Sequence, residues 1–88
     1  MTPIEIERRN RIRLSVAAYA YEYKHVSIMS DAEFDALSLK IDPSVSTGNR
    51  KLDAFFKTTF TPDSGMWIRK HPDKRGLANI YHRYWRQV

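Results

Sequence analysis

Residues 12–23 read IRLSVAAYAYEY, and the period of this run indicates an α-helix. Its apolar side chains recur every three or four residues, which places one set on a single helical face: Ile12, Val16, Tyr19 and Tyr23. A second set widens the stripe: Leu14, Ala17 and Tyr21. A helix with such a face must pack against other elements to bury it.

The start and end of this helix are marked by the residues on either side. Thr2 is expected to cap the first turn, Pro3 suits the first helical position, and Glu5 completes a capping box. The helix is predicted to run to about Lys24. Residues 25–29 break the period, and Ser30-Asp31-Ala32-Glu33 then repeats the capping-box pattern.

A second helix is predicted from this cap to the Asp42-Pro43 pair, because proline disfavours helix in the residue before it. Phe34, Leu37 and Ile41 form its apolar face. Two helices joined by a short connection favour an antiparallel hairpin. Residues 8–42 are therefore predicted to contain a helical hairpin.

Shorter helices, turns and loops are predicted in the second half of the chain. Residues 44–49 are expected to be a loop, residues 51–60 a short helix, and residues 61–65 a turn. Residues 66–68 are expected to be briefly extended, and Pro72 to open a last helix. The fold class is predicted to be all-α, a single domain over residues 1–88 built as a small helical bundle with an N-terminal antiparallel hairpin.

Composition narrows the classes of protein. Apolar residues make up 42% and charged residues 28% of the 88, as in globular proteins. There is no cysteine, so disulfides and thiolate metal sites are excluded. No apolar run approaches the roughly 20 residues of a membrane span, and the early Glu5 argues against a signal peptide. A cytoplasmic protein without membrane contact is expected.

The positive charge is concentrated in the second half. The net charge is +5; residues 1–48 carry a balance of −1 and residues 49–88 a balance of +6. A basic half suggests an anionic partner, although small domains are often basic without one. Four arginines also crowd the first helix and are interpreted as a solvated face near Glu5 and Glu7: Arg8, Arg9, Arg11 and Arg13.

One segment carries a resemblance to a known family. It comprises Tyr19-Ala20-Tyr21-Glu22-Tyr23 and, after a short gap, Met29-Ser30-Asp31-Ala32-Glu33-Phe34-Asp35-Ala36-Leu37. This segment resembles the small helical N-terminal domain of NAD-dependent DNA ligases, which binds the nicotinamide mononucleotide half of NAD. The resemblance covers less than half of the chain.

The resemblance implies nicotinamide contacts at Tyr21, Asp31 and Asp35. Two positions depart from the family: Glu22 stands where His is usual, and Phe34 where Tyr is usual. An acid beside a phosphate-bearing ligand is unfavourable, so these departures weaken the prediction of nucleotide binding. The alternative interpretation is that Tyr21 and Phe34 join two helices in the core.

No catalytic site is predicted, and the chain is not expected to be an enzyme. The ligases need a Lys-x-Asp-Gly motif in a much larger domain, whereas Lys51-Leu52-Asp53-Ala54 lacks the glycine. His25, His71 and His82 are too scattered for a metal site and are interpreted as solvated or capping residues. Neither a cofactor nor a metal is expected.

The basic half, residues 49–88, is the second candidate surface. It mixes cations with aromatic residues that suit phosphate contact and base stacking, or contact with an acidic protein: Trp67, Arg69, Lys70, Lys74, Arg75, Arg83, Trp85 and Arg86. The alternative is that Trp67, Tyr84 and Trp85 belong to the core.

Three hypotheses follow. The favoured one is a non-catalytic interaction module, of the kind a phage carries, that binds and modulates a host protein or protein–nucleic-acid complex. The second is nucleic-acid binding of low specificity through the basic half. The third is binding of nicotinamide mononucleotide or NAD by the ligase-like hairpin, with Tyr21, Glu22, Asp31, Phe34 and Asp35 at the site.

Overall fold

A computed structural model describes residues 1–84. Within that range the chain forms four α-helices and one 3₁₀ helix: α1 (Pro3–Lys24), α2 (Asp31–Lys40), α3 (Arg50–Thr58), η1 (Met66–Lys70) and α4 (Lys74–Tyr84). The predicted all-α bundle is confirmed. In the described part of the chain, no helix is both long and apolar enough to cross a membrane.

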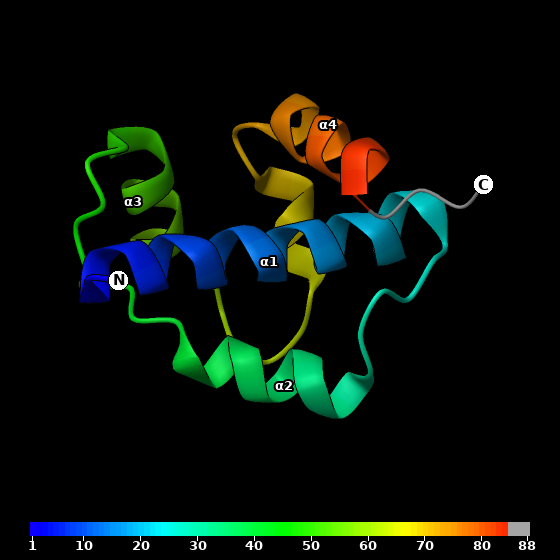
Figure 1. Cartoon of the computed structure of the whole chain (residues 1–88), viewed down its shortest axis with the longest axis horizontal. Coiled ribbons are helices and arrows are strands. Elements are labelled where there is room, and N and C mark those ends of the chain that lie inside the picture. Colours follow the sequence, from blue (N-terminus) through cyan, green and yellow to red (C-terminus); the bar gives the residue numbers. More distant parts are fainter. Residues whose placement is uncertain (85–88) are drawn as a thin grey trace.

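Helix α1 is the centre of the molecule. Its residues 14–20 are all buried, and seven consecutive positions span almost two helical turns, so every side of the helix is covered there. Figure 1 shows α2 on one side of α1, with α3, η1 and α4 on the other. The predicted stripe is thus only part of the buried surface, and its outer members Ile12 and Tyr23 are partly exposed.

The N-terminal hairpin forms as predicted. Thr2 caps α1, and Ser30 with Glu33 forms a complete capping box at α2. The two helices run antiparallel (Figure 1). Helix α1 ends at His25, which takes the left-handed conformation at φ 58°. This backbone turn directs the chain into the short connection to α2.

An aromatic cluster closes the other side of α1. It consists of Phe55, Phe56, Phe60 and Trp67, whose ring centroids lie 5.1 to 6.0 Å apart. Trp67 is only 5% exposed. The alternative interpretation of Trp67 as a core residue is correct, and its prediction as a partner-binding residue is wrong, because the small core uses its indole ring for burial.

Three local predictions in the second half need correction. Residues 66–70 form a 3₁₀ helix rather than an extended segment, and the third helix stops at Thr58 rather than Phe60. The last helix begins at Lys74, not Pro72. The Asp73 carboxylate accepts from the Gly76 N–H, and a Cβ on Gly76 would collide with that carboxylate. Glycine therefore preserves this helix cap.

The arginine cluster of α1 is not a uniformly solvated face. Arg8, Arg9 and Arg13 are exposed, but Arg11 is 4% and Glu7 5% exposed. The prediction fails at these two positions because α3 and the loop before it cover this end of the helix. A network of hydrogen bonds and ion pairs compensates the buried charges of Glu7 and Arg11.

Candidate functional site

Two hollows open along α1, one beside each half of the helix. The first has a volume of about 820 Å³ and lies between the first half of α1, the start of α3 and the start of α4. We call it the cationic cavity. The second, of about 830 Å³, lies between the second half of α1, α2 and residues 64–66. We call it the acidic groove.

One wall of the cationic cavity is built around the buried guanidinium of Arg11. Its Nε donates to Glu7 at 2.7 Å, and one terminal nitrogen donates to Asp53 at 2.9 Å. The other terminal nitrogen donates to the carbonyls of Asp42 and Val45, at 2.8 and 3.0 Å. The guanidinium therefore ties α1, the loop at residues 42–47 and α3 together.

The carboxylates around Arg11 are themselves well bonded. Glu7 accepts from the Asp42 N–H, and Asp53 accepts from both the N–H and the hydroxyl of Thr47. The Thr47 hydroxyl contributes most to lowering the pKa of Asp53 below its ordinary value, against the effect of burial. Because Glu7 and Asp53 compensate the charge of Arg11, this cation is structural.

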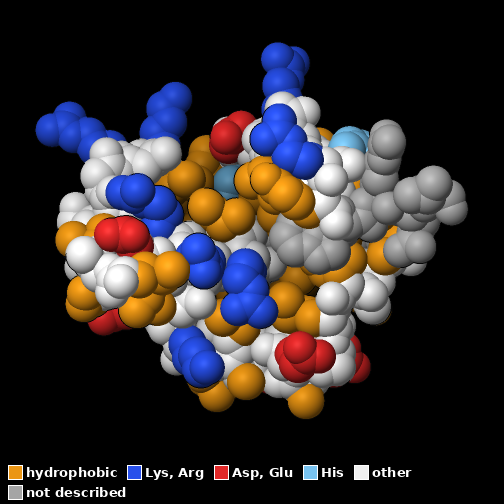
Figure 2. All heavy atoms as spheres, viewed as in Figure 1, with side chains coloured by type: hydrophobic (Ala, Val, Ile, Leu, Met, Phe, Trp, Pro, Cys, Tyr) orange, Lys and Arg blue, Asp and Glu red, His pale blue; other side chains and the backbone are white. Residues whose placement is uncertain are grey.

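The remaining cations of the cavity are uncompensated. Within residues 1–84, Arg8, Arg50 and Lys51 have no ion-pair partner, and the cavity wall carries one carboxylate, Asp73. Arg8 donates to the Thr47 carbonyl at 2.6 Å. Figure 2 shows Lys and Arg side chains over α1 and around the hollow between α3 and α4. The cavity therefore has an excess of positive charge.

His71 lies inside the cavity and is only 6% exposed, so its interpretation as a solvated residue is wrong. Its Nδ1 accepts a hydrogen bond of 3.0 Å from the Asp73 N–H, just before α4, in agreement with a capping role. Burial lowers the pKa of His71 to about 4. The imidazole is thus neutral at pH 7, and its proton is on Nε2 because Nδ1 is an acceptor.

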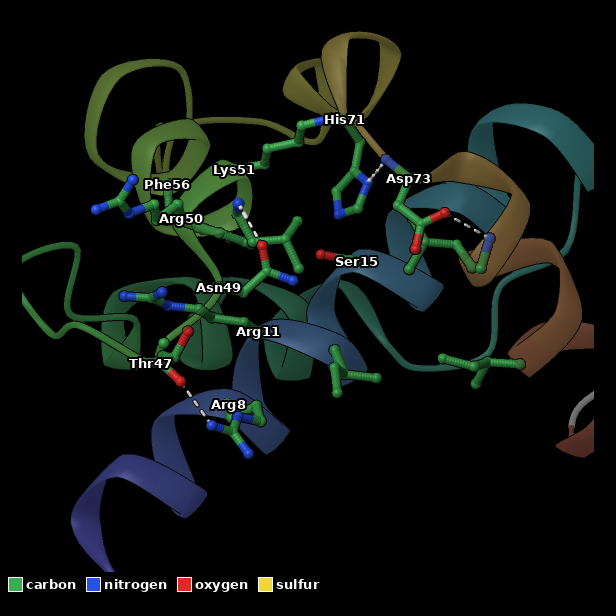
Figure 3. A pocket seen from close by; sticks show the side chains of 16 residues that line it. Arg8, Arg11, Ser15, Thr47, Asn49, Arg50, Lys51, Phe56, His71 and Asp73 are labelled. Atoms are coloured by element: carbon green, nitrogen blue, oxygen red, sulfur yellow. Dashed lines mark hydrogen bonds between the residues drawn. The ribbon is translucent and has the colours of Figure 1, made fainter.

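Ser15 is another buried polar group of the cavity. It is 1% exposed, and its hydroxyl has no hydrogen-bond partner among residues 1–84. Figure 3 shows this hydroxyl directed into the space between Asn49 and His71, with the free ring nitrogen of His71 facing the same space. Two buried donors therefore point into one hollow.

The acidic groove brings together every residue implied by the ligase resemblance. Its lining includes five side chains from α1 and α2: Tyr21, Glu22, Asp31, Phe34 and Asp35. Tyr21 is 64% exposed, so the alternative of a core tyrosine is wrong. Phe34 is half-buried and packs against the core, so that alternative holds in part for the phenylalanine. Asp31 and Asp35 are exposed at the rim.

Glu22, which stands where the ligase family usually has histidine, forms an ion pair with an arginine of η1. Arg69 donates to both carboxylate oxygens of Glu22 at 3.3 Å. The Glu22 carboxylate raises the pKa of Arg69 further. This exposed ion pair neutralises the acid at the groove and commits Arg69, a residue predicted to bind a partner, to a contact within the chain.

The other predicted partner-binding residues that the structure describes are not part of the cationic cavity. Lys70, Arg75 and Arg83 are exposed on η1 and α4, and the Lys74 ammonium donates to the His71 carbonyl. Trp85 and Arg86 lie outside the described residues. Within residues 1–84, no predicted partner-binding residue lines the cationic cavity.

Sequence reasoning missed the cavity itself. Its key polar groups are Ser15, His71 and Lys51, drawn from three separate segments. One signal was present, because Ser15 is the one serine or threonine within the apolar run of residues 14–20. The i,i+4 spacing of Glu7 and Arg11 likewise indicates an ion pair, though not its burial.

No family model, curated protein or solved structure matches the chain. Within residues 1–84, no group of three or more His, Cys, Asp or Glu side chains is arranged to hold a metal ion. The function must therefore be argued from the two hollows.

Proposed function

We propose that the chain is a non-catalytic module that binds a nucleic-acid strand through its phosphates, at the cationic cavity. The observation that carries this proposal is the cavity lining, where Arg8 and Lys51, without an ion-pair partner among residues 1–84, and the buried side chains of Ser15 and His71 stand against one carboxylate. Phosphate contacts from Lys and Arg supply most of the affinity of sequence-independent binding. A module of this kind is able to act within a larger protein–nucleic-acid complex.

The same lining argues against base stacking as the source of affinity. The aromatic residue of the cavity wall, Phe56, is 1% exposed, and Trp67 is in the core. Stacking platforms need an accessible ring face. We therefore infer phosphate contact with little preference for sequence.

The test is fluorescence anisotropy with a labelled single-stranded DNA over a series of salt concentrations. Affinity should fall steeply with salt, and Lys51→Gln should weaken binding and make the salt dependence shallower. Lys40→Gln is the matched control, because Lys40 is exposed at the end of α2 and outside the cavity. Equal losses in the two variants, or binding insensitive to salt, would contradict the proposal.

The acidic groove supports a second candidate function, the binding of nicotinamide mononucleotide or NAD. The supporting observation is that one groove contains all five residues implied by the resemblance. The exposed face of Tyr21 is able to stack on the positive nicotinamide ring, and Asp31 and Asp35 are able to accept from the ribose hydroxyls and the carboxamide. Arg69 brings a cation to Glu22, where the family usually has histidine.

Titration with nicotinamide mononucleotide, followed by NMR, tests this candidate. Tyr21→Ala and Asp31→Ala should abolish the shifts of the groove residues 21–35 in a protein that stays folded, whereas Lys51→Gln should leave those groove shifts unchanged. Absence of groove shifts in the wild type at millimolar nucleotide would remove the candidate.

A further inference from the structure

The floor of the cationic cavity has the features of a site for one phosphate group. We propose that it binds a phosphate monoester, the group found at the end of a nucleic-acid strand and on a free mononucleotide. The inference rests on the proposed function, because the strand reaches the cavity through the same cations. It adds a preference for phosphorylated strand ends.

The Ser15 hydroxyl is the first argument for a ligand. A buried hydroxyl without a hydrogen-bond partner is destabilising relative to a bonded one. Ser38 on α2 is equally buried and equally unpartnered, but it lines neither hollow. Ser15 differs because it lines the cationic cavity, into which its hydroxyl is directed (Figure 3).

His71 supplies the second donor. Its Nδ1 is fixed as an acceptor by the Asp73 N–H, so the neutral ring presents Nε2–H to the cavity. A neutral N–H fixed in this orientation is able to donate to an anion oxygen. Because the ring is uncharged, its burial avoids the desolvation penalty that a buried cation would carry.

Lys51 and the start of α3 complete the site. Figure 3 shows the Lys51 side chain extending toward His71, while the Arg50 guanidinium points away from the cavity. Asn49 caps α3 by accepting from the Leu52 N–H, so the positive end of this nine-residue helix borders the same space. The negative charge of Asp73 is offset by these groups and by the hydrogen bond that its carboxylate accepts from the Gly76 N–H.

Burial of the two donors favours a monoester over an internal phosphodiester. Ser15 and His71 are 1% and 6% exposed, so a bound oxygen must enter the cavity to reach them. An internal phosphate carries a nucleoside on both sides, whereas a terminal phosphate has three free oxygens and enters end-on. Its second negative charge also matches the excess of cations.

The first experiment titrates the protein with inorganic phosphate at pH 7 and constant ionic strength, followed by ¹H–¹⁵N NMR. Amide signals of Ser15, Lys51 and His71 should shift together in the wild type and in Ser38→Ala, but not in Ser15→Ala. No shift in the wild type, or equal shifts in Ser15→Ala, would overturn the proposed site.

The second experiment compares single-stranded DNAs of one sequence that carry a 5′-phosphate, a 3′-phosphate or hydroxyl ends. A terminal phosphate should strengthen binding about tenfold, equivalent to about 1.4 kcal/mol. Ser15→Ala and His71→Gln should remove that preference, while Ser38→Ala retains it. Equal affinity for all three strands would overturn the preference for ends.

The two proposals fail in different ways. Shifts with phosphate and a mononucleotide, but no binding of any strand, would overturn nucleic-acid binding and support the phosphate site with a free nucleotide as ligand. Salt-sensitive binding of all strands, without a preference for phosphorylated ends and without shifts from inorganic phosphate, would support nucleic-acid binding and overturn the phosphate site.

Discussion

The cationic cavity and the acidic groove have nearly equal volumes, about 820 and 830 Å³, but they are built differently. The cavity contains buried donors, held by a network that crosses three segments. The groove carries its charges at an exposed rim, on two helices adjacent in the chain. Desolvated donors bind an anion more strongly than exposed groups in water, so the cavity is better suited than the groove to bind an anion.

The largest expected effect is on the network that holds the cavity. Arg11→Met leaves Glu7 and Asp53 without their cation, and removing one partner of a buried ion pair typically destabilises by about 3–5 kcal/mol. The free energy of unfolding should fall by that amount in urea denaturation. Arg9→Met, at an exposed position of the same helix, should change it by less than about 0.5 kcal/mol. A similar small change in both variants would contradict a structural role for Arg11.

The next effect depends on pH and distinguishes the cavity from the groove. His71 has a folded pKa of about 4 and an ordinary value of 6.5, so the unfolded chain binds the proton first as the pH falls. The unfolding free energy should therefore decrease from about pH 6.5 to pH 4, with additional losses at the acidic end from Glu33, Asp42 and Asp53, whose folded pKa values are also lowered.

Urea denaturation at several pH values checks this dependence. The His71→Gln variant should lack the decrease over this range, and Tyr21→Ala, in the groove, should keep it. A flat profile in the wild type would show that His71 is not desolvated.

A smaller effect is expected at the two buried serines. Ser15→Ala and Ser38→Ala each remove an unpartnered hydroxyl. Both variants should therefore leave the free energy of unfolding unchanged or raise it by up to about 1 kcal/mol. Calorimetry would measure this. A loss above about 1 kcal/mol in Ser15→Ala alone would indicate a bond that Ser15 makes within the folded chain.

The smallest effect is expected at the groove. Arg69→Ala removes an exposed ion pair with Glu22, and only a small loss of stability is expected because solvent screens such pairs. Chemical denaturation at low and high salt should show a difference of this size that shrinks with salt. A loss comparable with that of Arg11→Met would mean that the two ends of α1 are stabilised equally.

Much of the fold could be predicted because its signals are local. Capping residues such as Thr2 and Ser30 mark helix starts, and the Asp42-Pro43 pair marks an end. The 3₁₀ helix at residues 66–70 could not be predicted, because five residues carry no clear period and burial of Trp67 determines their conformation.

The two hollows also differ in how far their residues could be predicted from local sequence signals. The groove residues lie within residues 17–35 and 64–66, so a contiguous sequence motif contains most of the residues that line it. The cavity joins residues 8–15, 47–52 and 71–80, and no local pattern connects these segments. Burial of Arg11 depends on the loop that covers it, which composition alone does not indicate.

The most direct test of the central claim is one NMR titration of the wild type with a 5′-phosphorylated single-stranded DNA at moderate salt. We predict that the largest amide shifts fall on the cavity segments, above all at Ser15, Lys51 and His71, and that the groove segments remain unchanged. Shifts confined to Tyr21, Asp31 and Asp35, or no shifts at all, would contradict the assignment of function to the cationic cavity.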